Sequence, residues 1–573
     1  MHCAPRPAGM LQSTRHARMC FLFLRRGLSG RLAVASKWSK RQRERYAAQL
    51  ICGSCEFLGY LSETAPFSFP LRCVVFLLSG LLLSSRQWCR EAQVGASRIT
   101  TWCTVTRMLT VVALLWATFA LICRYRKRSY AKSTVGFLHP AAGAGGGGER
   151  VLWVALEGLQ HADAAKGIER QYVVFTNEYA PEDPSSTATS DQHLLSLVEK
   201  QFSIRLLRPV RFIYLRPAMT RWLSGDAYPH LTLLLQTFWG GASLFYEVAV
   251  VNAVTPIVIE TVGVPFVYPL LRLLAGCTVI SYTHYPVISS AMTQRVRSGE
   301  VSHTNSLILA RNPALRSVKV AYYQIFALLY RWMGYFPNII LTNSSWTQNH
   351  MQSLFWPRTC IRLYAPCDVA RFAAESHPPA QRSNRIVSVG QFRPEKNHML
   401  QLAAFHAALP QLPRDAKLVM IGGTRNAEDE KRVAQLRVRA KELGIENQVE
   451  ILVNATVEVV RAELGKCMIG LHTMRDEHFG IVLLEYLAAG CIPLGHRSGG
   501  VELDIINSPD LGFLAVTAEE YAAAMVDIFE MRLRYPERYA RFQQRGSDHV
   551  KSFDDSSFRT RFVELVSKYV YPG

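Results

Sequence analysis

Short apolar segments alternate with helix-like segments along the chain after residue 134. Five apolar segments, each four to six residues long, lie at 171–176, 211–214, 255–260, 278–282 and 339–343. Such an alternation is typical of βαβ units, whose strands form a mostly parallel sheet. The pattern therefore predicts a Rossmann-like α/β domain over residues 133–372.

A second alternation follows a polar, proline-containing stretch at residues 373–385, which is typical of a linker between domains. It predicts strands at 386–389, 417–421, 449–452, 468–472 and 492–495, with helices near 398–408, 426–443 and Glu485. We expect a second Rossmann-like domain over residues 386–560. Two such domains, with parallel sheets facing a cleft, form the GT-B arrangement of the α/β class, which binds ligands at the carboxyl ends of the strands.

Residues 108–123, MLTVVALLWATFALIC, form an uncharged apolar run just before a basic cluster. A membrane-spanning helix needs about 20 residues, so this run predicts a slightly short transmembrane anchor. The cluster consists of Arg124, Arg126, Lys127, Arg128 and Lys132. By the positive-inside rule, it places the following residues in the cytosol. A cleaved signal peptide is the alternative, but no clear small-residue cleavage site precedes the cluster.

The net charge of +21 first suggests a nucleic-acid-binding protein. However, residues 1–130 hold 20 Lys and Arg against 4 Asp and Glu, so the other 443 residues carry only +5. We therefore expect no nucleic-acid partner. Residues 1–107 are interpreted as a basic extension that is disordered or not translated, because Met108 opens the apolar run and is a candidate start.

Eight of the 13 cysteines precede residue 130, and the others show no disulfide spacing, which indicates a reducing compartment. Two further apolar regions, 230–254 and 255–277, contain little charge. They are either buried core elements or an aromatic face that lies on a membrane. The sequence leaves both interpretations open.

Two glutamates stand eight positions apart in the segment HTMRDEHFGIVLLEYLAAGCIPLGHRSGG. Glu485 lies in an aliphatic helix, where an unpaired carboxylate is costly, so we expect ribose hydroxyls as its partners. Glu477 lies in the preceding loop, before Gly480, and is free to bind sugar hydroxyls. A glycosidase pair is disfavoured, because an offset across loop and helix does not naturally set the carboxyl separation that hydrolases use.

Candidate cations follow the first strand of the second domain, in VGQFRPEKN. Arg393 and Lys396 come after Gly390 and are expected to face the cleft. There they would stabilise a departing nucleoside diphosphate by preorganised charge. Solvated surface charge is the alternative interpretation.

The first domain offers a glycine run, Gly145, Gly146, Gly147 and Gly148, between a strand-like and a helix-like segment. This position favours an anion-binding loop over a flexible linker. His284 ends a predicted strand in SYTHYP, which favours a functional role over a structural one; His472 and His478 are weaker candidates. No D-x-D motif occurs, so a metal-bridged diphosphate of the kind that this motif provides is not supported; no metal site and no cofactor are expected.

Six segments carry a family resemblance through their order and spacing: GFLHPAAGAGGGGERVLW, SYTHYPVIS, TNSSWTQNH, LYAPCDV, SVGQFRPEKNH and the two-glutamate segment above. Together they resemble the GDP-mannose-dependent α-1,2-mannosyltransferases of dolichol-linked oligosaccharide assembly, a retaining GT-B family. The resemblance covers residues 134 to about 560. One departure is Gln391, where most of the superfamily has an arginine; Arg393 is the candidate substitute.

The resemblance implies transfer of the fourth and fifth mannoses from GDP-mannose to Man3GlcNAc2-PP-dolichol on the cytosolic face of the endoplasmic reticulum membrane. Other mannosyltransferases of the pathway are expected as further partners. By this resemblance, Glu485 would bind ribose, Glu477 mannose, Lys396 and Arg393 the diphosphate, and the glycine run the phosphates. His284 would lie near the reacting sugar. The remaining substrate-binding positions would be Gly390, His478, Phe479, Gly480 and Ile481.

The sequence leaves two rival functions open. One is a retaining GT-B enzyme with another donor, such as UDP-glucose or UDP-GlcNAc, and a soluble acceptor. The other is a membrane-bound scaffold that has kept the fold without activity. The predicted tether disfavours a soluble acceptor, and the presence of Glu477, Glu485, Lys396 and His284 disfavours a scaffold.

Overall fold

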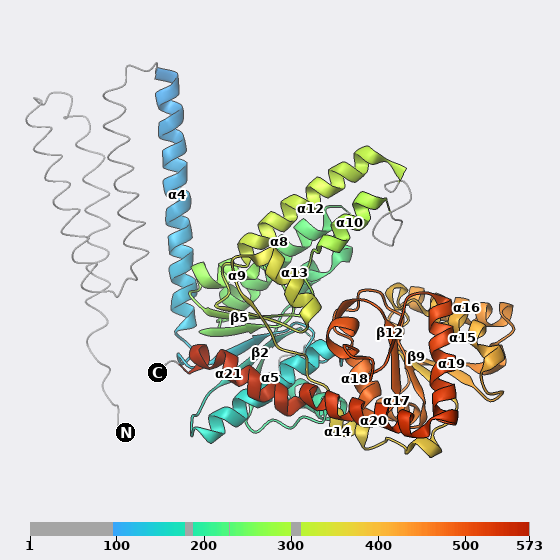
Figure 1. Cartoon of the computed structure of the whole chain (residues 1–573). Coiled ribbons are helices and arrows are strands. Elements are labelled where there is room, and N and C mark those ends of the chain that lie inside the picture. The colour runs from blue at the N-terminus through green and yellow to red at the C-terminus, as the bar shows by residue number, and fades with distance from the viewer. Residues whose placement is uncertain (1–95, 178–186, 229, 300–310, 572–573) are drawn as a thin grey trace, which may run out of the picture. The chain divides into compact units, whose positions relative to one another are not determined.

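The computed structural model describes residues 96–177, 187–228, 230–299 and 311–571. One compact unit, Thr118–Gly573, holds two α/β halves, each built on a parallel sheet (Figure 1). Most of the predicted extension at residues 1–107 lies outside the described residues. The predicted α/β class with two parallel sheets is confirmed.

The first half contains a seven-stranded sheet in the order β3-β2-β1-β4-β5-β6-β7. Every neighbouring pair is parallel, which confirms the βαβ prediction. The strands are β1 (Val135–Leu138), β2 (Tyr172–Thr176), β3 (Val210–Tyr214), β4 (Ile257–Glu260), β5 (Thr278–Thr283), β6 (Ile339–Thr342) and β7 (Cys360–Arg362). The sequence pattern missed β7, because three residues at a sheet edge produce no periodic signal.

The second half contains a six-stranded parallel sheet in the order β10-β9-β8-β11-β12-β13. The strands are β8 (Arg385–Val389), β9 (Lys417–Gly422), β10 (Val449–Val453), β11 (Ile469–Leu471), β12 (Ile492–His496) and β13 (Phe513–Ala515). In the first sheet β1 lies between β2 and β4, and in the second sheet β8 lies between β9 and β11. The direction in which strands are added to each sheet therefore reverses at β1 and at β8. Ligands bind doubly wound sheets at such switch points.

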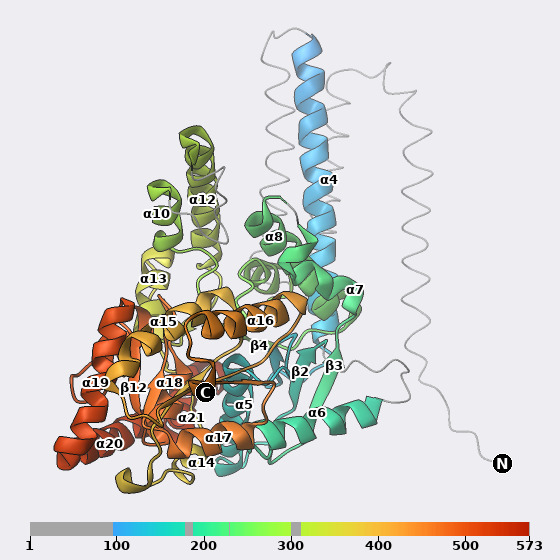
Figure 2. The ribbon, with the colours of Figure 1, turned by 90° about the vertical axis from the view of Figure 1, so that its right-hand side faces the viewer.

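Helices cover both faces of the first sheet. In the two views, α8 and α12 lie on one side of this sheet, and α5 and α21 on the other (Figure 1) (Figure 2). The helices of the first half include α5 (Gly147–Ala165), α6 (Thr187–Phe202), α7 (Pro217–Thr220), α8 (Thr232–Phe245), α9 (Val267–Pro269), α10 (Ser290–Ser298), α12 (Pro313–Met333) and α13 (Ser345–Phe355). Those that follow are α14 (Val369–Ala373), α15 (His398–Ala408), α16 (Ala427–Glu442), α17 (Val457–Lys466), α18 (Ile481–Ala488), α19 (Ala518–Arg534), α20 (Pro536–Val550) and α21 (Asp555–Val570).

The last helix, α21, returns to the first half and packs on α5. Arg559 forms an ion pair with Glu157 at 2.7 Å, and the Tyr569 hydroxyl donates a hydrogen bond to the Asn338 carbonyl at 2.9 Å. The boundary predicted at residue 560 therefore falls inside a helix that belongs, by its contacts, to the first half. Sequence periodicity could not reveal this, because it does not report which sheet a helix covers.

The predicted anchor segment, 108–123, lies within the helix α4 (Ala96–Lys127). Among the described residues, one helical stretch is long and apolar enough to cross a membrane; it is Thr232–Val251 rather than the predicted anchor, and 44% of its apolar window is buried. It combines α8 with the π-helix η5 (Tyr246–Val251). One side of this stretch packs into the core, through Leu244, Phe245 and Val248, while Phe238 and Trp239 are exposed.

Candidate functional site

The two halves meet where strands of both sheets end. Ser344, which follows β6 and caps α13, donates a hydrogen bond from its hydroxyl to the His478 carbonyl at 2.5 Å. The Ser345 N–H donates to the buried Asp504 carboxylate at 2.8 Å. These contacts hold the loop of Glu477 against the first half, so residues from both halves share one site.

A three-residue cluster surrounds the first predicted glutamate. One carboxylate oxygen of Glu477, Oε2, lies 2.6 Å from Lys396 Nζ and 3.1 Å from His472 Nε2. Burial alone would raise the pKa of Glu477, but the His472 hydrogen bond and the Lys396 charge hold it well below its ordinary value. Glu477 is therefore an ionised acceptor, and Lys396 is held beside it rather than in solvent.

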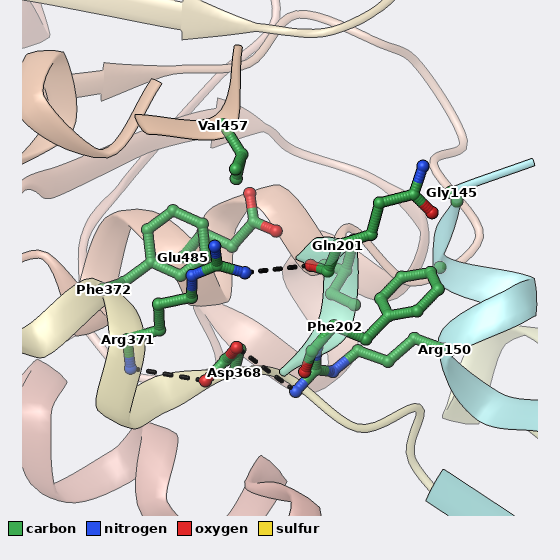
Figure 3. Close-up of a pocket in the computed structure, with 12 residues that line it drawn as sticks. Gly145, Arg150, Gln201, Phe202, Asp368, Arg371, Phe372, Val457 and Glu485 are labelled. Atoms are coloured by element: carbon green, nitrogen blue, oxygen red, sulfur yellow. Dashed lines mark hydrogen bonds and ion pairs between the residues drawn. The ribbon is translucent and has the colours of Figure 1, made fainter. Parts of the chain in front are cut away.

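Glu485 faces a pocket of about 140 Å³ that both halves line. Its carboxylate is flanked by Phe372, Val457 and Gln201 (Figure 3). Burial raises the pKa of Glu485 to about 7, although Arg150 opposes this rise. No hydrogen bond or ion pair to this carboxylate is present within the described residues. A half-buried carboxylate that faces a pocket without a protein partner suits a polar ligand that donates to it.

The opposite wall of this pocket was not predicted. Arg371 donates to the Gln201 carbonyl at 3.0 Å, and Asp368 lies 3.6 Å from Arg150 (Figure 3). Arg150 also forms an ion pair with Asp555 at 2.5 Å. The motifs GGGGERVLW and LYAPCDV contain Arg150 and Asp368, but their spacing in the sequence does not indicate that they meet.

The resemblance assigns the ribose of GDP-mannose to Glu485, so the binding of GDP-mannose is expected to weaken as the pH falls below 7. The two carboxylate oxygens of Glu485 can accept two ribose hydroxyl hydrogen bonds only when the group is ionised. Since its pKa is about 7 in the empty protein, the Kd should rise by about tenfold per pH unit below that value. Titration calorimetry without acceptor measures this, because the phosphodiesters of GDP-mannose do not titrate in this range.

Glu485→Gln is the matched control for this pH dependence. It should bind GDP-mannose more weakly and with a Kd that stays flat from pH 5.5 to 8.5. His284 and His478, with pKa values lowered to about 4 by burial, do not titrate in this window. The same pH slope in the variant would contradict the role of Glu485.

The glycine run forms the turn into α5. Gly145 has a positive φ of 78°, and Gly146 caps the helix, with its N–H donating to Glu149 at 2.7 Å. A Cβ on Gly147 would lie 3.7 Å from Ile481, and one on Gly148 would lie 3.5 Å from His284 Nε2. The structure therefore brings the glycine run, Ile481 and His284 together.

His284 is half-buried, and its buried Nε2 has no hydrogen-bond partner within the described residues. Burial, with a smaller contribution from His139, lowers its pKa to about 4, so the ring is neutral at physiological pH. His139 itself lies 3.2 Å from Glu149 and 2.7 Å from the Thr261 hydroxyl. An unsatisfied nitrogen directed at the glycine turn suits contact with a bound substrate.

The two predicted cations differ in their surroundings. Lys396 packs its stem near Gly390, where an added Cβ would lie 3.6 Å from Lys396 Cδ. Arg393 instead lies 3.9 Å from Glu395, and burial and the nearby Arg425 lower its pKa. Lys396 therefore belongs to the Glu477 cluster. Arg393 instead lies near Glu395 and Arg425.

The segment from His478 to Ile481 is fixed by packing. The His478 ring stacks on Tyr285 of the first half, with centroids 3.8 Å apart, while Phe479 is buried against Tyr364. Phe479 can therefore offer a ligand its backbone but not its side chain. Gly480 has a positive φ of 94° and caps α18.

The turn Ser498-Gly499-Gly500, at the end of the two-glutamate segment, packs against the loop of Glu477. A Cβ on Gly499 would lie 2.3 Å from the Glu477 carbonyl oxygen, and one on Gly500 would lie 2.5 Å from that of His478. Only glycine allows this turn to support the acidic loop so closely.

Two family models match the chain. The model described as "ALG11 mannosyltransferase N-terminus" matches residues 132–355, and "Glycosyl transferases group 1" matches residues 370–549. Together they cover the two halves that meet at the pocket.

Curated relatives match most of the chain. GDP-Man:Man(3)GlcNAc(2)-PP-Dol alpha-1,2-mannosyltransferase of Homo sapiens is 38% identical over 81% of this chain and 94% of its own length. The protein of the same name from Dictyostelium discoideum is 35% identical, over 78% and 86%.

Solved structures share the fold at low sequence identity. Sucrose-phosphate synthase from Thermosynechococcus elongatus has a TM-score of 0.52 at 15% identity, with 77% of this chain and 100% of that chain covered. The N-terminal domain of Candida albicans trehalose-6-phosphate phosphatase has a TM-score of 0.53 at 11% identity, with 76% and 96% covered. The GT-B prediction is confirmed, and the chain belongs to the family of GDP-Man:Man3GlcNAc2-PP-Dol α-1,2-mannosyltransferases, which are glycosyltransferases.

Proposed function

We propose that this protein transfers mannose from GDP-mannose, with retention and in α-1,2 linkage, to Man3GlcNAc2-PP-dolichol, adding the fourth and fifth mannoses. The family membership supports this reaction. The observation that carries the proposal is the unpartnered Glu485 carboxylate in a pocket lined by both halves. Such a group suits the ribose of a nucleotide sugar.

The donor would lie across the pocket with its diphosphate near the glycine turn. Gly145 to Gly148 lead into the first turn of α5, whose N–H groups have no acceptor within the helix. These groups and the positive end of the helix dipole favour a phosphate. Glu485 would then hold the ribose, since Gly147 of α5 and Ile481 of α18 line the same pocket as Glu485.

The reacting sugar would lie between Glu477 and His284. The ionised Glu477 accepts hydrogen bonds from mannose hydroxyls, and Lys396 stabilises the negative charge that develops on the diphosphate. The mannose C1–O bond to phosphate breaks while the acceptor oxygen attacks the same face of C1. The departing phosphate oxygen takes the proton of the acceptor hydroxyl, so no carboxylate nucleophile is needed.

We place the enzyme at the endoplasmic reticulum membrane with its two halves in the cytosol. The apolar run in α4 would supply the anchor. The basic residues after it bind the first half: Arg124 donates to the Leu273 carbonyl at 2.9 Å and Lys127 to the Gly276 carbonyl at 2.7 Å. Basic residues beside a spanning helix favour the cytosolic side.

Incubation of the detergent-solubilised protein with GDP-mannose and lipid-linked Man3GlcNAc2 tests the proposal through product size. The expected product is longer by two mannoses, both released by an α-1,2-mannosidase. UDP-glucose and UDP-GlcNAc serve as donor controls and should give no product. Transfer from a UDP-sugar alone, or none from any donor, would contradict the proposal.

A further inference from the structure

A hollow of about 540 Å³ lies in the first half, between α8 and the short helices at residues 217–227. Its lining includes Trp222, Tyr228, Leu235, Trp239, Ala242 and Tyr246. The volume lies within the range of about 300–1,000 Å³ that small-molecule pockets span. Trp239 and Tyr246 remain 53% and 45% exposed, so water contacts an apolar surface that a ligand would cover.

The shape of this hollow is fixed by contacts in its walls. The Tyr228 hydroxyl donates to the Trp222 carbonyl at 3.0 Å, and the Gln236 amide donates to the Leu223 carbonyl at 2.6 Å. A Cβ on Gly240 would lie 3.0 Å from Leu223 Cδ2, so this glycine lets the 3-10 helix at residues 221–223 approach α8. The hollow is therefore preformed rather than a gap between mobile side chains.

The last turns of α4, from Thr118 onward, contact the same helical stretch that lines the hollow. The Phe119 and Phe245 rings lie 6.3 Å apart, and Tyr246, the next residue, faces the hollow. Arg126 donates to the Val251 carbonyl at 2.9 Å. Because basic residues of this kind mark the cytosolic surface of a membrane, the hollow lies near that surface when α4 is the anchor.

The surroundings of the hollow are suited to a membrane surface. Leu231 and Phe238 are 54% and 48% exposed beside the aromatic lining. Arg221 lies over the Trp222 ring, 4.7 Å from its centroid. Exposed aromatic side chains with a nearby cation are typical of the interface between lipid and water.

We propose that this hollow binds a segment of the polyisoprenyl chain of the lipid-linked acceptor, next to its pyrophosphate. The inference rests on the proposed function, which supplies the lipid nature of the acceptor. To reach the site between the two halves, the sugar and pyrophosphate must leave the membrane surface, which exposes the first isoprene units to water. A preformed apolar hollow covers these units and avoids the cost of hydrating them.

The chemistry of the walls favours an isoprenoid chain over a phospholipid. Ser243, a polar residue of the lining, donates its hydroxyl to the Gly240 carbonyl at 3.0 Å and so is satisfied within the protein. The aromatic rings offer flat faces to a methyl-branched chain. The Arg221 guanidinium beside Trp222 supplies a cation for the adjoining pyrophosphate.

Filling the hollow tests the proposal by kinetics. Ala242→Trp should raise the KM for the dolichyl-linked acceptor by about tenfold, the low end of what an apolar pocket discriminates. The KM for GDP-mannose, and that for an acceptor with a short citronellyl chain, should not change. Trp239→Ala removes an exposed wall of the hollow and should also raise the KM for the dolichyl-linked acceptor. Val262→Trp, at a 43% exposed position outside the lining, is the matched control and should leave all three values unchanged.

Equal KM values for the dolichyl acceptor in both hollow variants and the parent would overturn the proposal. An equal rise in the KM values for the dolichyl and citronellyl acceptors would also overturn it, because the effect would then not depend on the long lipid chain.

Photolabelling tests the same hollow without mannose transfer. A diazirine-bearing polyprenyl pyrophosphate, added to the full chain in phosphatidylcholine nanodiscs, should label peptides within residues 217–246. Unlabelled dolichyl pyrophosphate should compete. Labelling outside this segment, or equal labelling by a diazirine phosphatidylcholine, would overturn the proposal. If labelling succeeds but no mannose is transferred, the proposed function fails and the lipid site stands.

Discussion

Lys396→Ala is expected to lower turnover by about 10²–10³, the scale of one lost contact to a developing anion. Lys396 Nζ lies 2.6 Å from Glu477, the carboxylate that we propose binds the sugar, so its charge is in place before the leaving group departs. Because the lysine acts mainly on the transition state, kcat should fall far more than the affinity for GDP-mannose. Steady-state kinetics with the lipid-linked acceptor measure both.

Lys417→Ala is the matched control. Lys417 also pairs with a glutamate, Glu450, at 2.7 Å, but this pair joins β9 to β10 and lies outside the site. Its removal should leave kcat unchanged. A turnover of Lys396→Ala within about threefold of the parent would contradict the role of this lysine in stabilising the leaving group.

Glu477→Gln is expected to lower kcat/KM by about 10–100-fold, the worth of a hydrogen bond to a charged group. The substitution keeps the shape of the side chain but removes the charge that, in the proposed function, accepts hydrogen bonds from mannose hydroxyls. It also releases Lys396 and His472, which both contact the same oxygen of Glu477. Kinetics of the single variants and the double variant with Lys396→Ala measure the coupling.

The double variant should lose less activity than the product of the two single losses, since residues that act as a unit are not additive. Glu450→Gln is the matched control and should retain parental kcat/KM. Additive losses would show that Lys396 and Glu477 act independently. This result would contradict the claim that the two residues act as one unit.

The sequence predicted those features that depend on local pattern. Strands such as 278–282 and 417–421 were found because buried parallel strands appear as short apolar runs between helix-like segments. The positions of Glu477, Lys396 and His284 at strand ends followed from the same pattern, because carboxyl ends of parallel strands share one edge. Glu477 directly precedes His478, whose carbonyl accepts a hydrogen bond from Ser344 of the first half. Lys396 forms an ion pair with Glu477, and His284 lies beside the glycine turn.

The features that the sequence could not predict depend on tertiary contacts. Lys396 was expected to face the diphosphate. Its ion pair with Glu477 could not be predicted, because the two residues are 81 positions apart in the sequence. Arg150 reaches Asp555 across 405 positions, because α21 returns to pack on α5. Asp504 supports the cleft from a π-helix (Val501–Ile505) that carries no periodic signal.

A structure of the detergent-solubilised protein bound to GDP-mannose would test the central claim most directly. We predict ribose hydroxyl oxygens at about 2.6–3.2 Å from the Glu485 carboxylate, with the diphosphate between the Gly145–Gly148 turn and Lys396. A nucleotide bound elsewhere, with Glu485 still without a partner, would contradict the account.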